Sequence, residues 1–176
     1  KKEYIILAVV IVLLSLYLFL RTRDRSHYEL PGIPEISKEN ITKIEIMKQD
    51  GSITLNKTNS DWHIAPNNYL ADQEKINAML DIIANLHLTA LVSESKNYKI
   101  YDLDDTSRIT VKAWSSGGSL KREFHVGKTA ESYRHTYVQL PEDDRVYHAS
   151  TNFRPKFDQT EEALRDKTVL SFDKSK

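Results

Sequence analysis

An uninterrupted apolar run near the N-terminus is the strongest constraint on how this chain can fold. Residues 4–20 read YIILAVVIVLLSLYLFL, with no charged side chain and one strongly polar residue, Ser15. A soluble core helix is rarely apolar on every face. As a helix, these 17 residues would rise roughly 26 Å, against about 30 Å for the hydrocarbon core of a bilayer. The run therefore predicts a transmembrane anchor.

Basic residues flank the run, and tyrosines lie toward its ends. Lysine and arginine side chains can reach the headgroups and so extend a short span, and tyrosine suits the interfacial zones. The predicted anchor residues are Tyr4, Ile5, Leu13, Leu14, Tyr17, Phe19 and Leu20, and the predicted flanking basic residues are Lys1, Lys2, Arg21, Arg23 and Arg25.

A cleaved signal peptide is the alternative interpretation of the same run. A signal peptide has a shorter apolar region, followed by small residues at a cleavage site. Here Leu18, Phe19 and Leu20 continue directly into Arg21, which favours an uncleaved anchor. The basic residues on the two sides nearly cancel under the positive-inside rule, so charge leaves the orientation open. We expect the domain outside the cytoplasm, the commonest arrangement for an N-terminal anchor followed by one C-terminal domain.

The zero net charge of the chain is the sum of two unlike parts. Residues 1–25 carry a net charge of +3, and the remainder carries −3. Neutrality argues against nucleic-acid binding, which usually needs a basic excess. The absence of cysteine excludes disulfides, thiolate metal sites and a cysteine nucleophile. We divide the chain into an anchor at residues 1–25, an extended linker at residues 26–40, where two prolines break helix, and a domain at residues 41–176.

Alternating apolar residues predict strands through most of this domain. Ile44-Glu45-Ile46 alternates, and Asp50-Gly51 after it is a strong hairpin signal. The predicted strands are residues 41–46, 53–55, 61–65, 88–92, 107–114, 120–126, 133–140 and 145–149.

Two helices interrupt the strands. Asp72 can cap the first, which should end near Leu86 and which has one apolar stripe. The stripe consists of Ile76, Met79, Leu80 and Ile83. A second, short helix is expected at residues 159–165. This order predicts an α+β fold: an N-terminal transmembrane helix, then a mainly antiparallel β-sheet domain with one main helix and a short C-terminal helix.

No local motif for catalysis, metal binding or cofactor binding stands out. Gly127-Lys128-Thr129 lacks the upstream glycine of a phosphate-binding loop. His125, His135 and His148 fall on three consecutive predicted strands and could meet there, but surface or half-buried positions are the default. The acidic stretches, including residues 142–144, lack calcium-loop spacing and are interpreted as solvated loops. We therefore expect no catalytic residue, no metal and no cofactor.

Aromatic residues are enriched on the predicted strands. Packing across strand pairs is the default explanation. The alternative is a protein-contact face, because tyrosine and tryptophan are favoured in interfaces. The candidate partner-contact aromatics are Tyr133, Tyr137 and Tyr147.

The order of several short stretches resembles a bacterial family known as domain of unknown function number 4340. The stretches include DWHI, LADQEKINAMLDIIANL, YDLDD, FHVGKTAESYRHTYVQL, DRVYHAS and LRDKTVLSFD, and the resemblance covers about residues 36–176. None of these features is catalytic. One departure is Asp102, where members commonly have glycine in a Tyr-Gly-Leu motif.

The resemblance implies a bacterial, transporter-associated accessory protein. Members typically have an N-terminal anchor and an extracytoplasmic domain, and their genes often lie beside those of gliding-motility-type ABC transporters. Members also often have a second, similar half, so the resemblance implies that this chain is the first part of a longer protein. The expected location is the bacterial inner membrane, with a single span and the C-terminal domain outside the cytoplasm.

These observations give one leading hypothesis and two alternatives. The leading hypothesis is a non-enzymatic, single-pass accessory subunit that contacts the lipid bilayer and binds integral-membrane partners in an ABC-type transporter complex, without nucleic acid. The first alternative is an envelope ligand-binding module for lipid or cell-wall glycan, which a deep apolar cavity would favour. The second is an envelope hydrolase, which would need three polar groups converging in a cleft.

Overall fold

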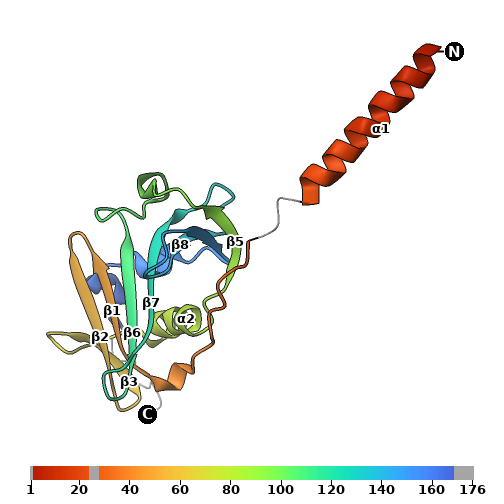
Figure 1. The fold of residues 1–176 in the computed structure, drawn as a ribbon. Helices are drawn as coiled ribbons and strands as arrows, with labels where there is room; N and C mark the ends of the chain where they lie inside the picture. Colours follow the sequence, from red (N-terminus) through yellow and green to blue (C-terminus); the bar gives the residue numbers. More distant parts are fainter. Residues whose placement is uncertain (1, 24–27, 169–176) are drawn as a thin grey trace, which may run out of the picture.

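The alternating segments of the sequence build one nine-stranded antiparallel sheet in the computed structural model, which describes residues 2–23 and 28–168 (Figure 1). The strand order is β4-β3-β2-β1-β6-β7-β8-β9-β5. The strands are β1 Ile41–Lys48, β2 Gly51–Thr58, β3 Asp61–Ala65, β4 Tyr69–Leu70, β5 Leu88–Ser93, β6 Ile109–Ser115, β7 Leu120–Thr129, β8 Thr136–Gln139 and β9 Val146–Ala149. The antiparallel pairing and the α+β class agree with the sequence prediction.

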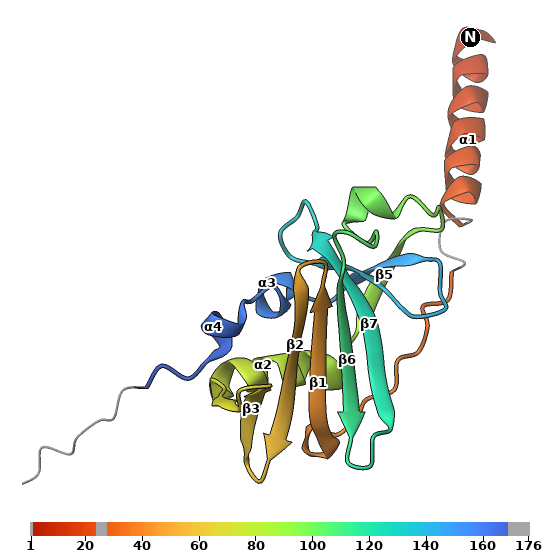
Figure 2. The same cartoon turned by 90° about the vertical axis from the view of Figure 1, so that its left-hand side faces the viewer.

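The strand register separates an inner, apolar face from an outer, more polar face. Ile46 of β1 lies opposite Val111 of β6, which lies opposite Phe124 of β7, and all three side chains are fully buried. Residues of the next register row point the other way, because successive side chains of a strand alternate between faces. In Figure 2 the strands β1, β2, β6 and β7 lie in front of α2, and no helix crosses the side that faces the viewer.

Helix α2, Gln73–Ala84, covers the inner face and carries the chain from β4 at one edge to β5 at the other. The Asp72 carboxylate accepts hydrogen bonds from the backbone N–H groups of Glu74 and Lys75, at 3.1 and 3.2 Å, and so caps the helix as predicted. The predicted apolar stripe is buried in the core. The helix ends at Ala84, two residues before Leu86.

Two short helices near the C-terminus close the same side of the core. They are α3, Arg154–Phe157, and α4, Glu161–Leu164. Phe157 and Phe153 meet Phe124 edge to face, with ring centroids 5.9 and 6.1 Å apart. Sequence patterning predicted a helix in the region of α4, whereas α3, β4 and the two 3-10 helices, η1 at Lys38–Asn40 and η2 at Tyr98–Tyr101, were not predicted.

A second, smaller apolar cluster lies on the outer face of β8 and β9. Its buried members are Leu103, Ala130, Tyr137 and Val146. Gly127 allows the loop after η2 to approach the sheet, because a Cβ at this position would lie 2.3 Å from the Tyr101 carbonyl oxygen and 2.9 Å from Leu103 Cγ. Leu103 of this loop therefore packs into the second cluster beside Gly127.

The segment before β1, expected to be a linker, packs onto the domain over its described part. Leu30, Ile33 and Ile36 are partly buried against the main core. The Ile36 N–H donates to the Ala84 carbonyl oxygen at 3.2 Å, and Lys38 pairs with Asp81. The segment is thus attached along the C-terminal half of α2.

Helix α1 spans Lys2–Arg23, but the predicted transmembrane anchor is wrong. Among the described residues, no helix combines the length and the apolar character needed to cross a membrane. This finding overturns three predictions: the transmembrane part of the fold, the single-pass topology and the inner-membrane location.

Candidate interaction surface

The connection between β7 and β8 displays the most exposed large hydrophobic side chain of the described residues, Tyr133, which is 81% exposed. Sequence patterning assigned Tyr133 to a strand, but β8 begins at Thr136 and residues 130–135 form a turn. Tyr133 has a positive φ of 59°, a conformation that bulky residues rarely adopt. Its N–H donates to the Ala130 carbonyl oxygen at 2.8 Å. The turn therefore holds Tyr133 outward at a conformational cost.

Hydrogen bonds from the body of the domain fix both ends of this turn. The Ala130 N–H donates to the His135 carbonyl oxygen at 2.9 Å, which closes the turn. The Asn152 side-chain amide donates to the Tyr133 carbonyl oxygen at 3.4 Å, while its Oδ1 accepts hydrogen bonds from Thr129 and Thr136. Asn152 thus connects the displayed residue to both flanking strands.

Two stacked histidines connect the end of the turn to β9. The rings of His135 and His148 have centroids 5.3 Å apart and planes inclined by 11°. His135 Nδ1 lies 2.8 Å from the Ala149 carbonyl oxygen, which requires Nδ1 to carry the proton and donate. Tyr137 also contacts His148, with ring centroids 4.9 Å apart.

Tyr137 is anchored to the turn by a carboxylate. Its hydroxyl donates to Glu131 Oε2 at 2.6 Å, and Lys128 Nζ lies 3.5 Å from Glu131 Oε1. Burial and this hydrogen bond raise the pKa of Tyr137 to about 12, so the hydroxyl remains a donor at neutral pH. The contact joins the turn to the second apolar cluster.

In the loop between β8 and β9, a carboxylate again accepts a hydrogen bond from a tyrosine hydroxyl, here on the opposite face of the sheet. Arg145 holds Asp143 through two hydrogen bonds of 2.9 Å, and the Tyr147 hydroxyl donates to Asp143 Oδ2 at 2.8 Å. The Arg145 hydrogen bonds lower the pKa of Asp143 to about 2, and burial raises the pKa of Tyr147 to about 12. The stretch that was interpreted as a solvated loop therefore contains a structural anchor.

The three candidate partner-contact aromatics do not share a surface. Tyr137 is 5% exposed and lies opposite His148, whereas Tyr147 is fully buried and lies opposite Val138. Neighbouring register rows point to opposite faces, so these two tyrosines belong to different clusters. Tyr133 alone of the three is open to a partner.

Comparison with known proteins places the chain in a family. A family model described as Domain of unknown function (DUF4340) matches residues 62–176, more than half of the chain and including the whole candidate surface. The chain belongs to the DUF4340 family. No curated protein and no solved structure matches it.

The histidines of this DUF4340 chain do not form a metal site among the described residues, in which no suitable group of three ligands is found. His125 instead lies 3.0 Å from the Thr110 hydroxyl, through its Nδ1. Only two of the three histidines on consecutive strands therefore meet. Sequence patterning indicated that these histidines could meet, which holds for His135 and His148, but it gave no signal for Glu131 or Asn152.

The outer face of the DUF4340 sheet is a second polar surface. Lys43 lies over the Trp114 ring at 4.5 Å from its centroid, and Lys112 pairs with Glu123 at 3.2 Å. These contacts connect neighbouring strands and satisfy the charges locally. The described part of this face is mixed in charge.

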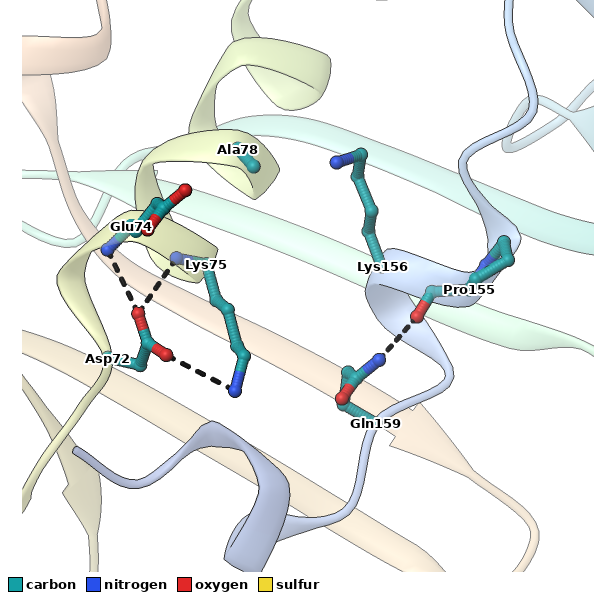
Figure 3. A pocket seen from close by; sticks show the side chains of 7 residues that line it. All are labelled: Asp72, Glu74, Lys75, Ala78, Pro155, Lys156 and Gln159. Atoms are coloured by element: carbon teal, nitrogen blue, oxygen red, sulfur yellow. Dashed lines mark hydrogen bonds and ion pairs between the residues drawn. The ribbon is translucent and has the colours of Figure 1, made fainter. Parts of the chain in front are cut away.

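An open groove of about 340 Å³ separates α2 from α3 (Figure 3). Lys75, at its edge, contacts the Asp72 carboxylate at 3.2 Å and donates to the Ala163 carbonyl oxygen at 2.6 Å. Across the groove, the Gln159 amide donates to the Pro155 carbonyl oxygen at 2.6 Å. Most of the polar groups described along the groove thus form contacts at the ends of the neighbouring helices. They do not converge on one point of the groove, as a set of catalytic groups would.

The predicted anchor and flanking residues lie apart from both surfaces. Those with described side chains are exposed on α1: Lys2, Tyr4, Leu13, Leu14 and Tyr17. Lys1 and Arg25 lie outside the described residues, and the same holds for the side chains of Ile5, Phe19, Leu20, Arg21 and Arg23.

Proposed function

We propose that this DUF4340 chain is a non-enzymatic accessory protein whose β7–β8 turn binds a protein partner through Tyr133. The observation that carries the proposal is the 81% exposure of Tyr133 in a left-handed conformation. Residues held in unfavourable backbone conformations persist where the surroundings enforce them, and such positions cluster at functional sites. Exposed tyrosines are also frequent anchors of protein interfaces.

The rigidity of the support favours a preorganised contact. Asn152, Glu131 and the histidine stack connect the turn to β7, β8 and β9. A contact residue that is already held in place loses little conformational freedom on binding, which strengthens association. Following the resemblance to transporter-associated proteins, the proposed partner is a protein subunit of an ABC-type transporter complex.

A cross-linking co-purification from cells of the source organism tests the proposal. The tagged wild-type chain should recover a transporter subunit, and Tyr133→Ala should reduce that recovery by about tenfold, because hot-spot tyrosines contribute 1–3 kcal/mol or more on truncation. Tyr28→Ala is the matched control, since Tyr28 is also exposed but lies in the segment before β1. Absence of any transporter subunit, or equal recovery by Tyr133→Ala, would contradict the proposal.

A further inference from the structure

The strongest unexplained feature beneath the proposed contact is the stacked pair His135–His148. The two rings lie nearly parallel, with centroids 5.3 Å apart, and Tyr137 also packs against His148. His148 Nε2 is buried and has no hydrogen-bond partner among the described residues. Such a nitrogen suits a neutral ring with an unprotonated Nε2. A proton there would create a buried, unpaired donor beside a second imidazole.

The groups that face His148 offer limited compensation for a positive charge. His135 and Glu131 come from the turn, and Tyr137 comes from β8. Glu131 already accepts the Tyr137 hydroxyl and pairs with Lys128. On the other side of β9, strand β5 has the sequence LTALVS and carries no titratable side chain.

The histidine pair is connected directly to the backbone that displays Tyr133. His135 receives the Ala130 N–H through its carbonyl oxygen, which closes the turn, and donates from Nδ1 to the Ala149 carbonyl oxygen. A displacement of the His135 ring would therefore act on the turn two residues from Tyr133. The positive φ of Tyr133 lies within the turn that this hydrogen bond closes.

We propose that the His135–His148 stack is a pH-responsive latch, which holds the Tyr133 turn closed while the His148 ring is neutral and releases it when His148 is protonated. This inference rests on the proposed function, because it regulates the same contact. Protonation gives the buried Nε2 of His148 an N–H without an acceptor, and it places a positive charge against the stacked His135 ring. Separation of the two rings removes both of these unfavourable interactions.

The direction of titration agrees with this geometry. Burial, followed by the neighbouring His135, lowers the pKa of His148 below its ordinary 6.5. The folded state therefore binds this proton less readily than the unfolded state does. The latch is fully stabilising above about pH 6.5 and weakens as the pH falls through that value toward the lower pKa of the folded state.

Hydrogen–deuterium exchange of the isolated full chain tests the latch without any partner. After correction for intrinsic exchange, the amides of residues 130–135 should lose about tenfold of their protection between about pH 7.5 and about pH 5. His148→Phe keeps an aromatic ring that cannot titrate, and it should abolish this change. His125→Phe is the matched control. His125 is another half-buried strand histidine with a lowered pKa, caused first by burial, and its variant should respond as the wild type does.

Equal loss of protection in His148→Phe and the wild type, or no loss in the wild type, would overturn the latch. If His148→Phe fails to fold, an NMR titration of the wild type decides the question. The His148 ring signals and the amide signals of residues 131–135 should then change with one common midpoint below pH 6.5. Separate midpoints would contradict the inference. If hydrogen exchange shows the pH response but no transporter subunit is recovered, the latch stands and the proposed function is refuted.

Discussion

Arg122 donates a hydrogen bond of 2.6 Å from Nη2 to the carbonyl oxygen of Pro34, which lies 88 residues earlier in the chain. The same guanidinium donates to the carbonyl oxygens of Ile83 at 3.1 Å and Ala84 at 3.5 Å, the last two residues of α2. Arg122 is only 7% exposed. It therefore supplies a buried positive charge to the negative end of the helix and attaches the N-terminal segment at the same point.

Replacement of this residue should separate the segment from the domain. We expect Arg122→Met to lower the free energy of unfolding by about 2–4 kcal/mol, because buried carbonyl oxygens lose charged donors. The amide of Ile36, which bonds to Ala84, should exchange faster with solvent. Chemical denaturation and hydrogen exchange measure the two effects. Lys121→Met is the control on an exposed neighbour, and equal denaturation midpoints for the two variants would contradict the assignment.

Local patterns were sufficient to predict most of the elements in this domain. The Asp72 cap and the apolar stripe of α2 involve residues within a few positions of one another. The hairpin after β1 was also predicted, although the pairing of Lys48 with Gly51 makes Gln49 and Asp50 the turn residues. Such features depend on short-range hydrogen bonds and side-chain periodicity, which the sequence displays directly.

The strand order and the candidate surface depend on contacts that the sequence does not display. Nothing local indicates that β1 pairs with β6 or that β5 joins the far edge beside β9. The left-handed Tyr133 breaks a stretch whose apolar alternation favours a strand. The tertiary hydrogen bonds of Asn152 to Tyr133 and of His135 to Ala149 override that local preference.

Gly127 should tolerate no side chain, because the loop after η2 lies against it. In Gly127→Ala the new Cβ would meet the Tyr101 carbonyl oxygen at 2.3 Å, so the backbone of that loop must move. We expect a loss of about 1–3 kcal/mol in the free energy of unfolding, with increased exchange at residues 98–104.

Gly32→Ala is the matched control for this substitution. Gly32 has no heavy atom within 4 Å of the position of a new Cβ. The melting temperature of the Gly32→Ala variant should equal that of the wild type. A Gly127→Ala variant as stable as Gly32→Ala would show that the loop does not need the close approach.

The Asp143 anchor should make stability depend on pH in the acid range. Its pKa is lowered from 3.8 to about 2, chiefly by the Arg145 hydrogen bonds, so folding favours the ionised carboxylate. The stabilisation is complete well above pH 3.8 and is lost as the pH falls through about 2. The Asp143 side chain is only 18% exposed, so solvent screens its charge little. The lowered pKa therefore corresponds to about 2 kcal/mol of stabilisation of the folded state at neutral pH.

Urea denaturation of Asp143→Asn across the acid range tests this dependence. The variant should be about 2 kcal/mol less stable than the wild type at neutral pH, and the difference should shrink toward zero near pH 2, where the wild-type carboxylate becomes protonated. Glu142→Gln is the adjacent control, because the exposed Glu142 side chain has no hydrogen bond or ion pair among the described residues. A constant difference between Asp143→Asn and the wild type at all pH values would show that Asp143 acts through packing, and that its charge contributes nothing.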